Sequence, residues 1–103
     1  MSCYFIVQVN CYDKHKRKVY DEYIQEVKPI IESYQGKYII RSENILSIDH
    51  QWQPDRFIVI EFPDQKHLDQ CFHSPEYLSI SQKRENNVES HAIIVGGTDN
   101  ENM

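Results

Sequence analysis

The sequence predicts an α+β fold with the element order β-α-β-β-α-β, in which two helices cover one face of a four-stranded antiparallel sheet. Residues 3–11 and 56–62 alternate like strands but carry apolar residues on both faces over much of their length, which places them at the centre of the sheet. Between them lies a segment whose apolar residues recur at three- and four-residue steps, as in a helix. Two helices can cover only one face of this sheet, so its other face is left uncovered.

The uncovered face of the predicted sheet indicates a homodimer. Monomers rarely expose a contiguous apolar patch of more than a few hundred Å² (roughly 300–600 Å²). Among oligomers, twofold symmetric pairs are the most common assembly. We therefore expect a second copy of the chain to pack sheet to sheet on the first.

The charge of the chain excludes two classes of partner. The 103 residues include 11 basic and 16 acidic side chains, which leaves a net charge of −5 at pH 7. Nucleic-acid binding rests on basic patches that neutralise phosphates, and an anionic membrane surface repels an acidic protein. We therefore expect no nucleic-acid partner and no membrane partner.

Length and composition indicate one cytoplasmic domain. Chains this short rarely divide, so a single domain is expected over residues 1–97, followed by a polar, disordered tail at 98–103. The N-terminus lacks the basic leader and apolar segment of a signal peptide. Apolar runs fall far short of the roughly 20 residues that cross a bilayer. The three cysteines are an odd number and are expected to be reduced thiols, which favours the cytoplasm.

The first strand and the first helix follow from the hydrophobic pattern. Residues 3–11 alternate, and a basic run at 14–18 then begins a long helix with a solvated first turn. Gln35-Gly36 ends this helix, with glycine in the left-handed conformation that is common at helix ends. The apolar stripe of the helix consists of Tyr20, Tyr23, Ile24, Val27, Ile31 and Tyr34.

The second strand and its continuation are less uniform. Residues 37–41 form a strand, and apolar residues alternate again from Ile45 to His50. This pattern predicts either one long strand broken by a bulge or a short hairpin, and we favour the bulge. Residues 51–55 form a turn before the strongly β-prone segment 56–62.

The C-terminal third is predicted to contain two helices and a last strand. Pro63-Asp64 begins a short helix whose core side carries Leu68, Cys71 and Phe72. Ser74-Pro75-Glu76 is typical of a helix start, with serine as the N-cap, proline in the first turn and an acid at the positive end. The helix that starts at Ser74 is expected to run to about Glu85. Together with the short helix before it, it forms the second helical unit of the fold, and residues 90–95 form the last strand.

Several short motifs occur in a characteristic order and spacing. They are YIQEVKP (23–29), YQGK (34–37), IR (40–41), WQPDR (52–56), IEFP (60–63), SPEY (74–77) and IVGG (94–97), together with Arg84. In this order and spacing they resemble the small bacterial family called domain of unknown function 1330, over residues 4–97. The resemblance implies a ferredoxin-like fold and a dimeric α/β barrel, in which two sheets pair. The superfamily includes small monooxygenases, muconolactone isomerases and haem-degrading enzymes, but this branch has no assigned reaction.

The chain departs from this family at two places. The segment before Tyr20 is about three residues longer than the family pattern, and the added part is the basic run 14–18. Ser42-Glu43 stands where the family usually has two glycines, which would allow a bulge with positive φ. The bend is therefore expected to be relaxed or moved to Asn44.

Three charged residues near strand ends are candidates for a ligand site. Glu61 shares a strand face with Phe57 and Val59, so its carboxylate lies at the edge of an apolar surface, where a cationic partner is expected. With Arg41 or Arg56, Glu61 would orient a small ligand in the cavity between sheet and helices. The alternative is an Arg–Glu pair that only satisfies polar groups at the mouth of the barrel.

Two aromatic residues complete the candidate site. Trp52 and Tyr77 either wall an apolar pocket or pack in the core or at the dimer interface, where aromatic residues are enriched. His67 and Cys71 are four residues apart on one helix, but no further ligand accompanies them, so no metal site is expected. The chain has three glycines and no phosphate-binding loop, and no cofactor is expected.

The sequence leaves three functions open. The first is a homodimer that binds a small, partly apolar molecule. The second is a cofactor-free isomerase or monooxygenase-like enzyme acting on a small aromatic or keto substrate, with Glu61 as base and Arg41 as anion clamp. The third is a non-catalytic structural or interaction module. A cavity reached by both Arg41 and Glu61 would favour the first two, whereas a cavity filled by aromatic side chains would favour the third.

Overall fold

Four antiparallel strands form one sheet in the order β2-β3-β1-β4 in the computed structural model, which describes residues 2–97. The strands are β1 (Cys3–Asn10), β2 (Lys37–Ser42), β3 (Arg56–Phe62) and β4 (Glu89–Gly96). The predicted central position of β1 and β3 is confirmed. The tail predicted at 98–103 lies outside the described residues.

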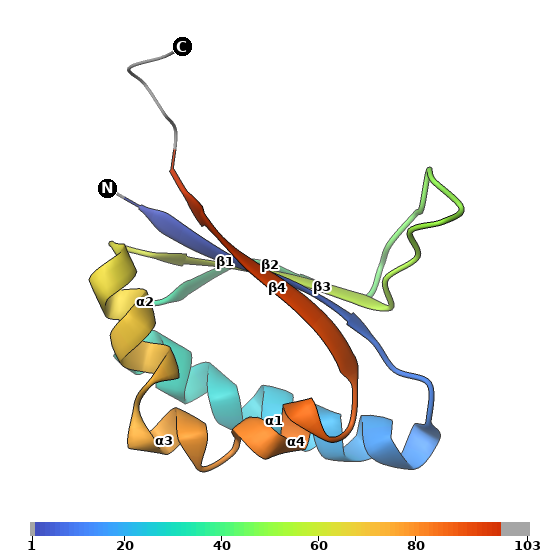
Figure 1. Cartoon of the computed structure of the whole chain (residues 1–103), viewed down its shortest axis with the longest axis horizontal. Coiled ribbons are helices and arrows are strands. Elements are labelled where there is room, and N and C mark those ends of the chain that lie inside the picture. Colours follow the sequence, from blue (N-terminus) through green and yellow to red (C-terminus); the bar gives the residue numbers. More distant parts are fainter. Residues whose placement is uncertain (1, 98–103) are drawn as a thin grey trace.

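The helices form a single layer beneath the sheet (Figure 1). They are α1 (Lys14–Ser33), α2 (Gln65–Phe72), α3 (Pro75–Leu78) and α4 (Ser81–Glu85). The side chain of Asp13 caps α1 by accepting hydrogen bonds from the backbone N–H groups of His15 and Lys16, at 2.8 and 3.1 Å. Within residues 2–97, none of the helices combines the length and the apolar character needed to cross a bilayer.

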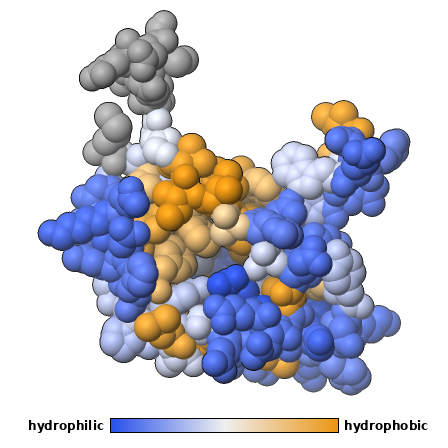
Figure 2. Space-filling view, in the orientation of Figure 1, coloured by the Kyte–Doolittle hydropathy of each residue, from blue (hydrophilic) through white to orange (hydrophobic). Residues whose placement is uncertain are grey.

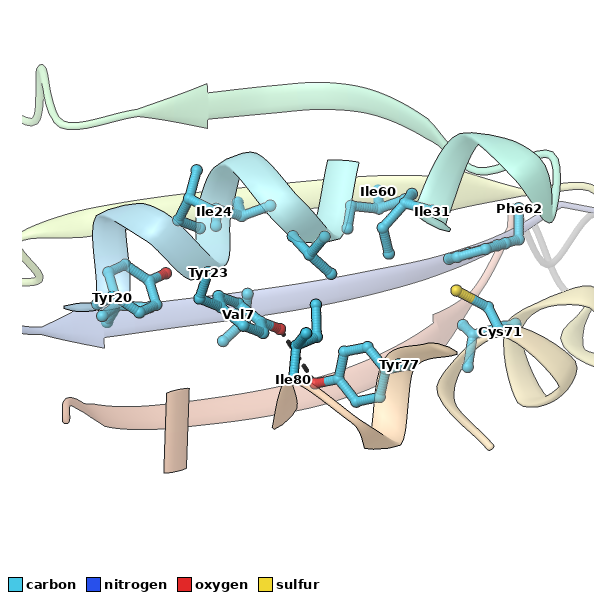
Figure 3. Close-up of a cluster of buried hydrophobic side chains, with 14 of the residues drawn as sticks. Val7, Tyr20, Tyr23, Ile24, Ile31, Ile60, Phe62, Cys71, Tyr77 and Ile80 are labelled. Carbon is cyan, nitrogen blue, oxygen red and sulfur yellow. Dashed lines mark hydrogen bonds between the residues drawn. The ribbon is translucent and has the colours of Figure 1, made fainter. Parts of the chain in front are cut away.

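The core lies between the sheet and this helical layer (Figure 3). Alternate residues of the two central strands point toward the helices and are buried, as the strand period of two requires. The strand side of the core consists of Val7, Val9, Ile58, Ile60 and Phe62, and α1 contributes Tyr20, Tyr23, Ile24, Val27 and Ile31. The helical stripe predicted from the sequence is thus the buried face of α1.

The end of α1 differs from the prediction at one residue. Gln35, and not Gly36, takes the left-handed conformation, with φ of 67°. Gly36 is needed for a different reason, because a Cβ atom there would lie 2.5 Å from Ile31 Cγ2 and 3.0 Å from Phe62 Cε1. The glycine lets the chain pass between the last turn of α1 and the end of β3.

Replacing Gly36 with alanine is expected to destabilise the protein by about 1–3 kcal/mol, the usual cost of overpacking a core. The added Cβ would also lie 2.9 Å from the backbone oxygen of Ile31, which cannot move without disturbing α1. Urea unfolding measures the loss. Gly96→Ala is the matched control, because a Cβ at Gly96 meets nothing within 4 Å. Equal stability of the two variants would contradict this packing.

The predicted continuation of the second strand to His50 is wrong. β2 ends at Ser42, which pairs with Phe57, one residue from the start of β3 at Arg56. The register shift lies earlier, between Tyr38 and Ile40. Residues 43–55, called the 43–55 loop below, project from the side of the sheet opposite the helices (Figure 1).

The helix predicted from residue 75 to about residue 85 is interrupted. The Ser74 N-cap is confirmed, since its Oγ accepts a hydrogen bond from the backbone N–H of Tyr77 at 3.2 Å. The chain then turns at residues 79–80 before α4 begins. Tyr77 before the turn and Ile80 within it are both buried in the core.

Candidate functional site

The face of the sheet opposite the helices, called the open face below, carries a row of exposed or half-buried apolar side chains. Ile6 of β1 pairs with Val59 of β3 on one side and with Ile93 of β4 on the other. Val59 in turn pairs with Ile40 of β2. Directly paired residues of antiparallel strands share a face. The central row of the open face therefore consists of Ile40, Val59, Ile6 and Ile93.

The rows on either side of this central row are mainly polar, with Val95 and Phe57 as their apolar members. Toward one end of the strands, Lys37 pairs with Glu61 and Glu61 pairs with Tyr4. Toward the other end, Gln8 pairs with His91. An apolar centre with a polar border is the arrangement of a protein–protein interface.

The 43–55 loop extends the apolar character of the open face. A hollow of about 530 Å³ lies between the loop and the sheet, and a second hollow of about 380 Å³ adjoins it. Trp52 and Phe57 line both hollows, with their ring centroids 6.4 Å apart in an edge-to-face arrangement. Leu46 and Ile48, near the tip of the loop, are 92% and 94% exposed. Nothing within one chain covers these side chains among the described residues.

Hydrogen bonds anchor the base of the loop to β1. The indole N–H of Trp52 donates to the side-chain oxygen of Gln8, and the amide of Asn10 donates to the carbonyl oxygen of Gln53 at 3.0 Å. The backbone N–H of Asp55 donates to the carbonyl oxygen of Val9 at 2.9 Å. Trp52, one of the predicted site residues, is thereby held on the open face.

The predicted pairing of Glu61 with Arg41 or Arg56 is not formed within the chain. Glu61 lies on the open face, where its carboxylate accepts a hydrogen bond of 3.0 Å from the Tyr4 hydroxyl, and this bond raises the pKa of Tyr4. Arg56 pairs with the buried Val9, and Arg41 pairs with the buried Ile58. The side chains of both arginines therefore project from the face of the sheet that the helices cover.

Both arginines have other partners. Arg41 donates from Nη2 to the carbonyl oxygen of Ile24 at 3.1 Å, and its guanidinium lies 5.0 Å from the centroid of the Tyr38 ring. Arg56 makes an ion pair of 3.3 Å with Glu43, at the start of the 43–55 loop. These contacts tie the helix side of the sheet to α1 and to the loop. A ligand on one face of the sheet could not touch Glu61 and Arg41 of the same chain together.

A small cavity lies between the sheet and the helices. Its volume is about 30 Å³, enough for about two water molecules. Aromatic and aliphatic side chains share its lining, and the rings of Phe5 and Phe72 lie with centroids 4.4 Å apart. The lining is apolar except for tyrosine hydroxyls and one guanidinium, that of Arg84.

Tyr77, the last predicted site residue, belongs to a hydrogen-bonded cluster at this cavity. Its hydroxyl lies 3.1 Å from the hydroxyl of Tyr23 (Figure 3) and accepts a hydrogen bond of 3.3 Å from Nε of Arg84. Arg84 Nη1 donates to Oγ of Ser90 at 2.8 Å. Burial raises the pKa of the Tyr23 phenol, and Tyr77 raises it further, so the phenol is neutral. The cluster, called the Tyr23–Tyr77–Arg84 cluster below, connects α1, α3, α4 and β4.

Sequence reasoning included Tyr77 but missed Tyr23 and Arg84. Tyr23 belongs to the apolar stripe of α1, and nothing in that pattern distinguishes a hydroxyl that finds a partner from one that does not. Arg84 belongs to the family pattern, and this resemblance was the sequence feature that could have identified it as a site residue.

The other reactive side chains have structural roles. Burial raises the pKa of the Cys71 thiol to about 12, so it is not a nucleophile near neutral pH. His67 Nδ1 lies 2.7 Å from the carboxylate of Asp64, which caps α2. Among residues 2–97, no three histidine, cysteine or acidic side chains are grouped so that they could hold a metal ion.

Comparison with known proteins identifies a family and a fold. The model of the family described as Domain of unknown function (DUF1330) matches residues 2–98. No curated protein matches the sequence. A protein of unknown function from Rhodopseudomonas palustris has a similar structure, with a TM-score of 0.79 at 16% identity over 95% of this chain and 83% of that chain.

Two further structures are similar at lower identity. A dimeric ferredoxin-like protein of unknown function from Jannaschia sp. has a TM-score of 0.79 at 10% identity, over 93% of this chain and 99% of that one. The cofactor-independent oxygenase SnoaB from Streptomyces nogalater has a TM-score of 0.67 at 7% identity, over 95% and 94%. These similarities show that the fold is ferredoxin-like.

Proposed function

Since this chain belongs to the DUF1330 family of domains of unknown function, we propose that it functions as a homodimer whose subunits each bind a small, partly apolar molecule. The observation that carries the dimer is the central row of the open face. Ile93 on β4 is 60% exposed and Ile40 on β2 is 44% exposed in the single chain, at the two ends of a row where water would otherwise contact a continuous apolar surface. A second copy covers this surface.

Three further observations support a second copy as the occupant of the open face. The exposed apolar residues of the 43–55 loop are continuous with the central row through Trp52 and Phe57, so loop and sheet form one surface. The similar protein from Jannaschia is described as dimeric. Polar side chains border the apolar row, which suits an interface whose rim meets water.

Trp52 provides a direct test of the dimer, because it is the one tryptophan of the sequence. Its side chain is 55% exposed in the single chain and lies on the open face. Burial by a second copy should shift its fluorescence emission to shorter wavelength as the protein concentration rises, in step with the sedimentation coefficient. A folded protein whose emission and sedimentation stay constant from nanomolar to high micromolar concentration, at the monomer value, would contradict the proposal.

The proposed ligand site is the cavity between sheet and helices. The Tyr23–Tyr77–Arg84 cluster reaches the otherwise apolar cavity wall through Tyr23 and Arg84. Such polar groups are costly to bury and suit a ligand with one polar end. Native mass spectrometry of freshly purified protein tests this. A small molecule that remains with the dimer and is released by denaturation is the expected result. Protein at the bare polypeptide mass, which also takes up no added ligand, would contradict it.

A non-catalytic interaction module is the second candidate, because the cavity volume of about 30 Å³ is small and the rings of Phe5 and Phe72 pack closely beside it. The enzyme mechanism with Glu61 as base and Arg41 as anion clamp has no such support, since the two side chains start from opposite faces of the sheet. The free thiols of Cys3, Cys11 and Cys71 support a reducing compartment, and we propose the cytoplasm.

A further inference from the structure

We propose that the ligand is a small carboxylic acid with a hydrocarbon body, whose carboxylate is bound by Arg84 while the body enters the cavity between sheet and helices. This inference rests on the proposed ligand binding and adds the chemical class of the ligand. It also assigns a binding role to Arg84 and to the two tyrosines beside it.

The position of Arg84 is unusual for a cation. Its side chain is 25% exposed and lies against the apolar cavity between sheet and helices. It extends from α4 to the facing side of β4, where it bonds to Ser90, and passes the hydroxyl of Tyr77 on the way. A guanidinium in this position has lost much of its hydration, which is unfavourable unless an anion replaces the water.

The protein itself supplies little negative charge to Arg84. Among the described residues, the one carboxylate within 4 Å is that of Glu85, at 3.8 Å from Nη2, and this side chain is 54% exposed. Tyr77 and Ser90 bond to Arg84 through hydroxyl groups, and Tyr23 is held neutral by its burial. The cluster therefore pairs one positive charge with neutral hydroxyl groups, and a ligand carboxylate would complete it.

The geometry of the guanidinium suits a carboxylate. Arginine carries five N–H donors in a planar fork that matches the two oxygens of a carboxylate, and such bidentate pairs are among the strongest hydrogen bonds in proteins. The bonds to Tyr77 and Ser90 are single bonds to hydroxyl oxygens, at 3.3 and 2.8 Å. A carboxylate would take their place, and the released Tyr77 hydroxyl could donate to it.

The rest of the cavity selects an apolar body. Beyond Arg84 and the tyrosine hydroxyls, the lining consists of aliphatic and aromatic side chains such as Phe5, Val27 and Phe72. The present volume of about 30 Å³ is too small for a six-carbon chain or a ring, so the ligand enters as Arg84 moves away from Ser90.

The proposed approach to the cavity lies beside β4. Ile94 pairs with the cavity residue Phe5 and therefore points to the helix side, yet it is 49% exposed. The helices thus leave this edge of the sheet uncovered. In Figure 2 the apolar surface near the centre of the molecule meets the hydrophilic helical layer at a recessed boundary. The open face, where a second copy is proposed to pack, is on the other side of the sheet, so dimer formation leaves this approach free.

Matched acid and amide pairs test the proposal on the wild-type protein. Hexanoate and benzoate have nearly the same shape as hexanamide and benzamide but carry a negative charge. In NMR titrations of the full chain, we expect the acids to bind at least about tenfold more tightly than the amides, the usual gain from a charged hydrogen-bond partner. The shifts should cluster at Tyr23, Tyr77 and Arg84.

Variants of neighbouring residues locate the effect. Arg84→Gln should weaken acid binding at least about tenfold and leave amide binding unchanged. Lys83→Gln removes the same charge from the adjacent position of α4, where the side chain pairs with Glu26 of α1 outside the cavity lining, and should bind the acids like wild type. Arg84→Lys keeps the charge but not the fork and should bind with intermediate affinity.

The possible outcomes separate this inference from the proposed function. If acids and amides bind to the wild type with equal affinity, the carboxylate class is wrong while ligand binding stands. The carboxylate class is also wrong if Lys83→Gln weakens the binding of the acids as much as Arg84→Gln does. If no acid and no amide binds and no small molecule accompanies the purified protein, both are overturned. The comparison of acid with amide on the wild type needs no variant, so it holds even where Arg84→Gln folds poorly.

Discussion

Replacing Ile93 with aspartate is expected to convert the dimer to a monomer. Ile93 lies on the edge strand β4, at one end of the central row of the open face, where it pairs with Ile6. In the dimer the new carboxylate would be buried against apolar side chains with no cation beside it, which costs several kcal/mol. We expect the dissociation constant of the dimer to rise at least about 100-fold, measured by sedimentation velocity over a range of concentrations.

Leu78→Asp is the matched control for this substitution. Leu78 lies on α3, in the helical layer, and its exposure of 57% is close to the 60% of Ile93. Leu78→Asp, like Ile93→Asp, replaces an exposed aliphatic side chain with a carboxylate, but on the opposite side of the molecule. Leu78→Asp should remain dimeric. A shift of both variants to monomer, or of neither, would show that the open face is not the interface, provided that circular dichroism shows both to be folded.

Replacing Phe62 with alanine is expected to cost about 3–5 kcal/mol of stability, the usual loss for a large buried aromatic residue. Phe62 is fully buried at the end of β3, with its ring centroid 6.0 Å from that of Phe72 in α2. Its ring also lies beside Gly36, where the chain passes from the end of α1 to the sheet. The substitution therefore removes contacts among three elements at once.

Urea unfolding at one fixed protein concentration measures the loss for Phe62→Ala, since the stability of a dimer depends on concentration. Tyr12→Ala is the control, because Tyr12 is also aromatic but lies exposed between β1 and α1. It should change the free energy of unfolding little. A loss below about 1 kcal/mol for Phe62→Ala, smaller than any usual large-to-small core change, would contradict the described packing.

Much of the fold could be predicted because local patterns coincide with burial. β1 and β3 carry apolar residues on both faces, and in the structure one face meets the helices and the other forms the open face. The stripe of α1 is its buried face for the same reason. Residues 45–50 were predicted to continue the second strand because apolar residues such as Leu46 and Ile48 alternate with polar ones, but they belong to the 43–55 loop. Alternation shows that a segment has an apolar side. It does not show that the segment pairs with the other strands of the sheet.

The candidate site was harder to predict because it depends on which face each side chain starts from and on contacts between distant segments. Arg56 and Glu61 are five residues apart in one strand, an odd spacing that places them on opposite faces. For Arg41, the register shift in β2 decides the face, and no sequence pattern locates that shift. Tyr23 meets Tyr77 across 54 positions, through the packing of α1 against α3.

Sedimentation equilibrium of the unmodified chain tests the central claim most directly. The open face predicts a single species of twice the chain mass of 12.3 kDa at micromolar concentration, with dissociation only on strong dilution. A folded species of 12.3 kDa at tens of micromolar, with its apolar central row in water, would contradict the account of the open face and with it the proposed homodimer.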